Sequence, residues 1–198
     1  PTWMGLLKRA SYQLSHVGKY HGETSRSLAG LGADRYTHEY DYTEWRRRQG
    51  IPPVVRSNGW FGEVDCQISS AQSRLAWEMD HVLRHLDDFS ERDRPFLLRW
   101  DPSEPHLPNR IPMDLENLYP PSEITPWPSF ADTLEGKPFM QRQQSRSWQT
   151  ENWTWEKNFA PMVSRYLAEI TLIDRQVGRL LEALESKGLL DQTLVIYT

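Results

Sequence analysis

Apolar residues recur at helical spacing in two stretches of the chain. Residues 73–89 place their apolar positions on one face of a helix, and the same 3.6-residue pattern continues through residues 161–187. Pro161 suits the first turn of the second helix, and Gly188 suits its end. A shorter pattern at residues 3–9 indicates the end of another helix. The apolar positions of the two long helices are Leu75, Met79, Val82, Leu83 and Leu86, then Val163, Tyr166, Leu167, Ile170, Ile173, Val177, Leu180, Leu181 and Leu184.

Three short runs of β-forming residues predict strands at residues 12–17, 96–100 and 193–198. The apolar centre of the second run indicates a buried strand, which ends at Asp101 and Pro102. Because strands alternate with helices, the sequence predicts an α/β fold with a largely parallel or mixed central sheet and helices on both faces.

Two long connections, residues 23–71 and 101–161, interrupt this alternation. The first carries Arg46–Arg48 and the pair Trp60 and Phe61, and the second is rich in proline and tryptophan. In one interpretation the tryptophans stack on a sugar or aryl group while the arginines bind further sulfates. In the other, which we favour, aromatic side chains pack the loops onto the domain and the basic run is solvated. The tryptophans concerned are Trp127, Trp148, Trp153 and Trp155.

The composition indicates one folded domain without affinity for nucleic acid. The 198 residues are 38% hydrophobic, which is enough for a single core. No apolar run is long enough to span a membrane, and the mean hydropathy is -0.70. A net charge of -4 argues against a nucleic-acid partner. Cys66 is the only cysteine, so no internal disulfide can form, and we interpret it as an ordinary thiol.

A Gly-Lys-x-His pattern follows the first predicted strand. In an extended segment Lys19 and His21 project to the same side. A lysine offers three donors to a tetrahedral anion, and a histidine can move a proton near neutral pH. Gly18 and Gly22 permit close backbone approach on either side. An anion site and a solvated Lys and His in a loop both fit this spacing.

His106 lies between Pro105 and Pro108, in a loop that those prolines stiffen at the carboxyl end of the 96–100 strand. Ligands bind at this end of the strands in open α/β sheets. The alternative is a surface histidine in a proline-rich turn.

A second pair of histidines has the spacing of a zinc site. His81 and His85 lie four residues apart on the predicted 73–89 helix, with Asp88 near the same face. Both histidines fall at the polar margin of an amphipathic helix, where we expect them to be solvated instead of binding a metal.

Taken together, these motifs resemble the sulfatases of the alkaline phosphatase superfamily. The resemblance rests on the Gly-Lys-x-His pattern, on the Pro-His-x-Pro turn after a strand that begins Pro-Phe, and on residues 166–181 followed by 187–198. It covers nearly the whole chain and is weakest between Asn109 and Pro161. It implies an alkaline-phosphatase-like α/β fold, in which residues 1–198 form part of a single catalytic domain.

The resemblance also implies roles for three residues. Lys19 matches the lysine that grips the sulfate and the nucleophile's oxygen, and His21 matches the histidine proposed to deprotonate the covalent intermediate. His106 matches the histidine at the ester's bridging oxygen, where it binds sulfate and helps the leaving group depart.

The family's remaining parts have no match in this chain. Its formylglycine arises from a Cys/Ser-x-Pro-x-Arg motif, which we expect upstream of Pro1. Its calcium ligands are expected further upstream and in a Ser-Asp-His/Asn-Gly turn directly after Thr198, and its second sulfate-binding lysine is expected downstream. We therefore expect residues 1–198 alone to release no sulfate.

The resulting expectation is a sulfuric ester hydrolase that acts on a small sulfate ester or a sulfated glycan, with a divalent metal, calcium, and a formylglycine held outside this segment. Two alternatives stay open. A phosphate or phosphonate ester hydrolase of the same superfamily is one, because tetrahedral anions of similar size fit similar sites. A noncatalytic relative that binds an anionic glycan or a protein is the other.

Overall fold

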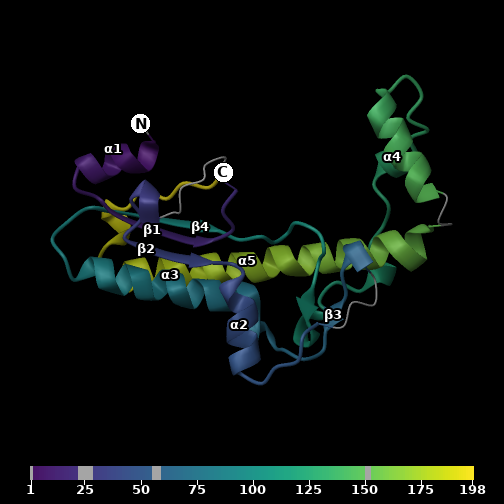
Figure 1. The fold of residues 1–198 in the computed structure, drawn as a ribbon. Helices are drawn as coiled ribbons and strands as arrows, with labels where there is room; N and C mark the ends of the chain where they lie inside the picture. The colour runs from purple at the N-terminus through teal and green to yellow at the C-terminus, as the bar shows by residue number, and fades with distance from the viewer. Residues whose placement is uncertain (1, 22–28, 55–58, 150–152) are drawn as a thin grey trace.

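The computed structural model describes residues 2–21, 29–54, 59–149 and 153–198, which Figure 1 shows as a ribbon. The helices are α1 (Trp3–Arg9), α2 (Asp41–Arg48), α3 (Arg74–Ser90), α4 (Phe139–Gln149) and α5 (Ala160–Ser186), the last preceded by a π-helical turn at Trp155–Phe159. The strands are β1 (Gln13–Gly18), β2 (Arg35–His38), β3 (Val64–Asp65), β4 (Phe96–Asp101) and β5 (Ile111–Pro112). Short 3₁₀ turns lie at Ala29–Leu31, Gly59–Phe61, Ser70–Gln72, Met113–Leu115, Pro121–Glu123, Pro128–Ala131 and Leu190–Gln192.

The three-stranded sheet is parallel and has the strand order β2-β1-β4. β1 lies in the middle and is buried along its whole length, as expected for a strand covered on both faces. The register pairs Leu14 with Leu97 and Gly18 with Asp101. Because parallel strands end at the same edge, the segments that follow β1 and β4 begin side by side. The predicted parallel α/β arrangement is confirmed.

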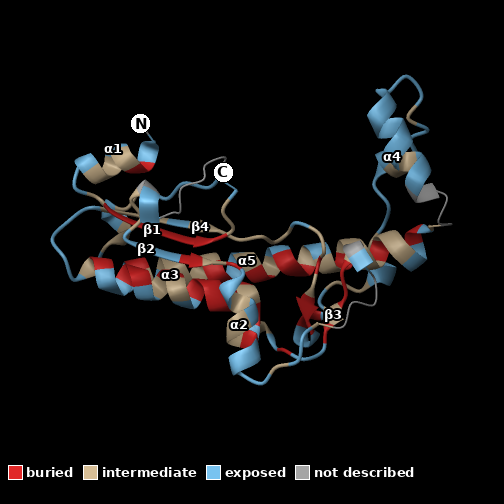
Figure 2. Ribbon diagram, viewed as in Figure 1, coloured by how far each residue is buried: buried red, intermediate tan, exposed pale blue. Residues whose placement is uncertain are grey.

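Helices cover both faces of this sheet. On one face α1 packs through Met4 against Leu14 of β1. On the other face Val17 of β1 contacts Met79 and Val82 of α3, and α5 packs beside α3. Figure 2 shows buried residues gathered along the sheet and on the helix faces turned toward it.

The predicted apolar face of α3 is the one that packs. The prediction for α5 was wrong for part of its face, because α5 buries Ser164, Ala168 and Leu172 and leaves the predicted Tyr166 and Ile170 exposed.

The long helix α5 links the sheet to a second small unit. It has 27 residues, a length of about 40 Å at the α-helical rise. Beyond the sheet it packs against β3 and β5, which form a two-stranded parallel ladder. Helix α4 projects from the rest of the chain and is mostly exposed (Figures 1 and 2). The apolar cluster around the ladder contains Leu75, Ile111, Leu115, Ala168 and Leu172.

Two expectations for the sheet were wrong. Residues 193–198 form no strand, and Leu194, Ile196 and Tyr197 are 84%, 71% and 92% exposed. A β-forming run becomes a strand only where a neighbouring strand offers a ladder, and no described strand pairs with this run. Conversely, the connection 23–71 contains β2, α2 and β3, which the sequence analysis did not predict. β2 is a polar edge strand, so it lacks an apolar signature.

Buried carboxyl groups lie beneath the carboxyl end of the sheet. Glu78 on α3 has no exposed surface, and its Oε2 accepts the Trp100 indole N–H at 2.9 Å. One turn earlier, Arg74 forms ion pairs with Glu39 at 3.2 Å and with Glu104 at 2.9 Å. Burial and the nearby Glu104 raise the pKa of Glu78 to about 8. At neutral pH Glu78 therefore holds a proton.

Replacing Glu78 by Gln should flatten the pH dependence of stability. Because the folded-state pKa of about 8 exceeds the ordinary 4.5, the native protein binds more protons between these values, and the free energy of unfolding falls as pH rises through that window. Gln has no proton to lose. Between pH 4.5 and pH 8 we therefore expect the unfolding free energy of E78Q to rise relative to that of the parent by up to about 4 kcal/mol. Urea unfolding of the full-length protein at both pH values measures this. The exposed Glu182→Gln serves as control, and an unchanged slope in E78Q would contradict the assignment.

Replacing Gly18 by Ala should destabilise the sheet. Gly18 has φ +105°, and a Cβ there would lie 2.7 Å from the Asp101 carbonyl carbon, so both backbone strain and steric overlap oppose a side chain. We expect G18A to lower the unfolding free energy by about 1–3 kcal/mol. In the control, Gly178→Ala within α5, a Cβ meets nothing within 4 Å, and we expect a gain of about 0.5–1 kcal/mol. Equal changes in unfolding free energy for G18A and G178A would show that the Gly18 backbone beside Asp101 does not require glycine.

Candidate functional site

The candidate site begins where β1 ends. After Gly18, the N–H of Lys19 donates to the Asp101 carbonyl of the adjacent strand at 2.7 Å. The Lys19 carbonyl accepts a hydrogen bond from Nε2 of His16 at 3.2 Å. The backbone N–H and the carbonyl of Lys19 are therefore both hydrogen-bonded, which fixes the position of its Cα at the end of β1.

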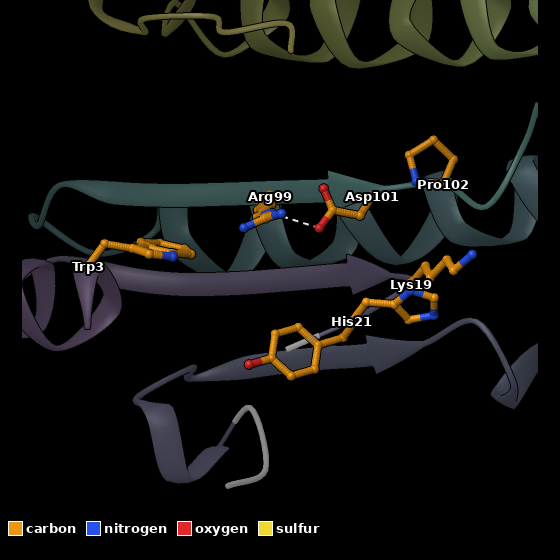
Figure 3. A pocket seen from close by; sticks show the side chains of 7 residues that line it. Trp3, Lys19, His21, Arg99, Asp101 and Pro102 are labelled. Atoms are coloured by element: carbon orange, nitrogen blue, oxygen red, sulfur yellow. Dashed lines mark ion pairs between the residues drawn. The ribbon is translucent and has the colours of Figure 1, made fainter. Parts of the chain in front are cut away.

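Lys19 and His21 line one cavity of about 420 Å³ at the carboxyl edge of the sheet. Figure 3 shows the two side chains just beyond the end of β1, near Asp101 at the end of β4. No ion pair joins Lys19 to any residue that the structure describes, so its ammonium group can meet an anion. The structure thus brings the two predicted residues together, whereas Gly22 lies outside the described residues. The other lining residues are Trp3, Tyr20, Arg99, Asp101 and Pro102.

A second set of charges lies on β4 at the same cavity. Arg99 Nε forms an ion pair with Asp101 Oδ2 at 2.7 Å, drawn as a dashed line in Figure 3. The Arg99 guanidinium also lies 5.7 Å from the centroid of the Trp3 ring, within range of a cation–π interaction. Asp101 offsets the charge of Arg99, so among the described residues that line the cavity Lys19 is the cation without an ion-pair partner.

His106 lies on the turn that follows β4, and the structure does not place it in the lining of this cavity. The turn leaves the same edge of the sheet as the Lys19 segment. His106 is exposed, its N–H donates to the Ser103 carbonyl at 3.0 Å, and its Nδ1 donates to the Leu107 carbonyl at 2.6 Å. Because a carbonyl oxygen only accepts hydrogen bonds, Nδ1 of His106 carries a proton.

Buried acids anchor the His106 turn. Glu104 is held by Arg74, and the Ser103 hydroxyl donates to Glu39. At the far end of the turn, Glu169 Oε2 accepts the Asn109 side-chain N–H at 2.7 Å, and its Oε1 accepts the backbone N–H of the next residue at 2.8 Å. Burial and the charge of Glu104 raise the pKa of Glu169 to about 8. The turn is therefore attached to α3, α5 and the end of β2 by polar contacts.

His81 and His85 are not solvated, contrary to the sequence prediction. They face the sheet, where His85 Nδ1 is 2.7 Å from the Ser15 hydroxyl and His81 Nδ1 is 3.2 Å from the Thr37 hydroxyl. Burial lowers the pKa of both rings to about 4. Each ring is thus a neutral hydrogen-bonding partner for a strand. In the described part of the chain no three His, Cys, Asp or Glu residues form a group that could hold a metal ion.

In the long connections most of the described aromatic residues pack, whereas the basic run is divided: Arg47 and Arg48 are exposed and form ion pairs with Glu44, as predicted for a solvated run. Arg46 is buried against Asp65 and also donates to the Pro52 carbonyl at 2.8 Å, so this part of the run is not solvated. Trp155 is 9% exposed, and its indole N–H donates to a backbone carbonyl at 2.9 Å. Trp153 contacts Phe61 and Phe159. The side chains of Trp60 and Trp148 lie outside the described residues, and Trp127 is 48% exposed.

Two further features bear on the predicted chemistry. Cys66 is exposed, and the residues that follow it do not form the family's nucleophile motif. Among the described helices, none combines the length and apolar character needed to cross a membrane.

Comparison with known proteins places the chain in a family. The family model described as Sulfatase matches residues 1–198. Human iduronate 2-sulfatase is 29% identical over 60% of this chain and 24% of its own length. Choline-sulfatase of Rhizobium meliloti is 26% identical over all of this chain and 41% of its own length. The chain thus spans less than half of the curated relatives it matches.

Solved structures show the same fold. The phosphonate monoester hydrolase of Silicibacter pomeroyi matches 98% of this chain and 46% of its own, with a TM-score of 0.73 at 17% identity. The phosphonate monoester hydrolase of Agrobacterium radiobacter matches 99% of this chain and 46% of its own, with a TM-score of 0.69 at 18% identity. The fold is therefore the alkaline-phosphatase-like one, and the chain belongs to the sulfatase family.

Proposed function

We propose that the full-length protein hydrolyses sulfate monoesters and that this chain supplies the cationic and proton-transferring side of the active site. The observation that carries the proposal is the Lys19 ammonium group, which has no ion-pair partner among the described residues and lines a cavity together with His21. Membership of the sulfatase family supports the same chemistry.

Lys19 would stabilise the charge of the reacting ester. A sulfate ester spreads negative charge over its nonbridging oxygens, and a preorganised cation directed at them is usually the largest catalytic contribution. Asp101 and His16 fix the Lys19 backbone, so little reorganisation is needed when the ester binds. His21, on the same side of the segment, would take up or release a proton at a nucleophile's oxygen.

His106 would act at the leaving group. Its Nδ1 hydrogen bond to the Leu107 carbonyl is a fixed donor contact that orients the ring. With Nδ1–H bound to that carbonyl, the imidazolium form of the ring carries a second proton on Nε2, and it would donate this proton to the bridging oxygen as the ester bond breaks, leaving the neutral ring with its Nδ1–H. The buried contacts of Glu104 and Asn109 would keep the turn in place during the reaction.

The metal and the formylglycine belong to other parts of the protein in this proposal. The described residues do not fit a metal site, because no group of three metal-binding side chains occurs among them. We therefore assign no metal ligand among the described residues, and we expect a divalent metal such as calcium to be bound by other parts of the full-length protein.

A second candidate is the hydrolysis of phosphate or phosphonate monoesters. The two phosphonate monoester hydrolases share the fold, and a lysine as a point charge binds either tetrahedral anion. The substrate proposed first is a small sulfate ester or a sulfated glycan. The third candidate is noncatalytic binding of an anionic glycan or a protein, which an assay must distinguish from the two hydrolytic activities.

Removing Lys19 or His21 should abolish most activity of the full-length protein. Assays with 4-nitrophenyl sulfate, 4-nitrophenyl phosphate and a phenylphosphonate monoester should show sulfate release as the fastest reaction. We expect kcat/KM to fall about 10²–10³-fold in Lys19→Ala and about 10²–10⁴-fold in His21→Ala. The exposed Lys137→Ala is the matched control and should retain activity. Activity of K19A equal to that of the control would overturn the assignment, and no turnover of any ester by the parent would favour a binding protein.

Loss of His106 should depend on the leaving group. Nitrophenolate departs without a proton, whereas an alkoxide needs one, so His106→Ala should lower kcat far more for an alkyl sulfate than for 4-nitrophenyl sulfate. Comparing kcat for both esters with parent and variant protein measures this difference. An equal loss for both esters would assign His106 to binding alone.

A further inference from the structure

His16 is a polar residue at the centre of the sheet. It has no exposed surface, and its Nε2 lies 3.2 Å from the Lys19 carbonyl oxygen. A carbonyl oxygen only accepts hydrogen bonds, so the ring carries its proton on Nε2. The other nitrogen, Nδ1, has no hydrogen-bond partner in the described structure and lies 3.8 Å from Asp101 Oδ2.

This arrangement is costly for stability alone. Nδ1 of His16 is a buried acceptor without a partner, which destabilises the fold by about 1–3 kcal/mol. An apolar residue of similar size would remove that cost and leave only the part-buried Lys19 carbonyl without this donor. His16 lies on the same face of β1 as Leu14, which packs against Met4 of α1. The register also sets Arg99 of β4 beside His16, so the position has both apolar and charged neighbours, and none of them is a hydrogen-bond partner for Nδ1 in the described structure. A ring with one nitrogen left without a partner needs a reason other than stability to be retained.

That hydrogen bond completes the attachment of Lys19. The Lys19 N–H is held by Asp101, and its carbonyl is held by His16. The Lys19 carbonyl belongs to the peptide that leads to Tyr20 and His21, so its direction sets where the next two side chains point. The edge of the Tyr20 ring also meets His16, with a centroid separation of 5.7 Å.

We infer that His16 is a positioning residue that directs Lys19 and His21 toward the ester through its Nε2–H hydrogen bond to the Lys19 carbonyl. The inference rests on the proposed hydrolysis and adds to it a residue that does not touch the substrate. Neither the cavity lining nor the motifs of the sequence include His16.

The charges around His16 support the neutral ring that this role requires. Burial lowers the pKa of His16 below 6.5, and Arg99 and His38 lower it further, whereas Asp101 and the hydrogen bond to Lys19 oppose the shift. A neutral ring has a single N–H, and the Lys19 carbonyl occupies it.

Three substitutions in the full-length protein test the inference. The side-chain amide of Gln can place an N–H close to the position of Nε2, the shorter Asn places it near Nδ1, and Leu has none. We expect His16→Gln to retain kcat/KM within about threefold, and His16→Asn and His16→Leu to lose about 10–100-fold because Lys19 and His21 are misdirected. Thermal unfolding of His16→Leu should be close to that of the parent, since removal of the unpaired Nδ1 offsets loss of the hydrogen bond to the Lys19 carbonyl.

A double-mutant cycle separates this role from a general effect on the fold. If His16 acts through Lys19, adding His16→Asn to Lys19→Ala should cost far less than it does in the parent. Full activity of His16→Leu, a loss in His16→Gln equal to that in His16→Asn, or additive losses in the double variant would each overturn the inference.

A measurement independent of turnover keeps the two proposals apart. In ¹⁵N-histidine-labelled full-length protein, with the His16 ring assigned by its absence from His16→Gln, the NMR spectrum at neutral pH should show the Nε2–H tautomer. An Nδ1–H tautomer would overturn the inference whether or not the protein is active. Absence of turnover together with the Nε2–H tautomer would reject the hydrolase and leave the hydrogen bond in place.

Discussion

The close approach of β1 and β4 at their carboxyl ends is the constraint on which the site depends. Gly18 lies against the Asp101 backbone, where a Cβ would overlap it, and the Lys19 N–H then bonds to the Asp101 carbonyl. The contact requires a parallel register in which these two residues are paired. The sheet register and the position of the site lysine are therefore fixed by the same contact, and a slip of one residue would move both.

Charge beneath the sheet edge is the second constraint. The carboxyl groups of Glu39, Glu78 and Glu104 crowd around Arg74, and a single guanidinium cannot neutralise all of them. A proton on Glu78 resolves the conflict. Glu104 belongs to the turn that carries His106. The ion pair between Arg74 of α3 and Glu104 therefore both offsets charge in this cluster and attaches the turn to α3. The stability of the core and the position of a candidate catalytic residue thus share one set of contacts.

The periodicity of apolar residues identified the helices that bury an apolar face. It failed for segments whose strand formation depends on pairing with another part of the chain. Helices α3 and α5 agree with the predicted 73–89 and 161–187 to within one residue at each end. Strand β2 is polar and lies at an edge, and the run 193–198 has strand-like residues without a described partner. Whether such a segment becomes a strand depends on the neighbouring chain, which a local pattern does not contain.

The same reasoning explains which site residues the sequence could identify. The sequence identifies Lys19 and His21 because they belong to a motif with a chemical meaning, and the structure shows that both line a cavity. His16 resembles an ordinary strand residue until its burial and the Nδ1 without a partner in the described structure are known. His85 of α3 is also buried, but its Nδ1 meets the Ser15 hydroxyl of β1. The two buried histidines thus differ in the hydrogen bonding of Nδ1, and the one whose Nδ1 has no partner is the one that contacts the backbone of the candidate site. This difference separates a structural histidine from one retained for the geometry of Lys19.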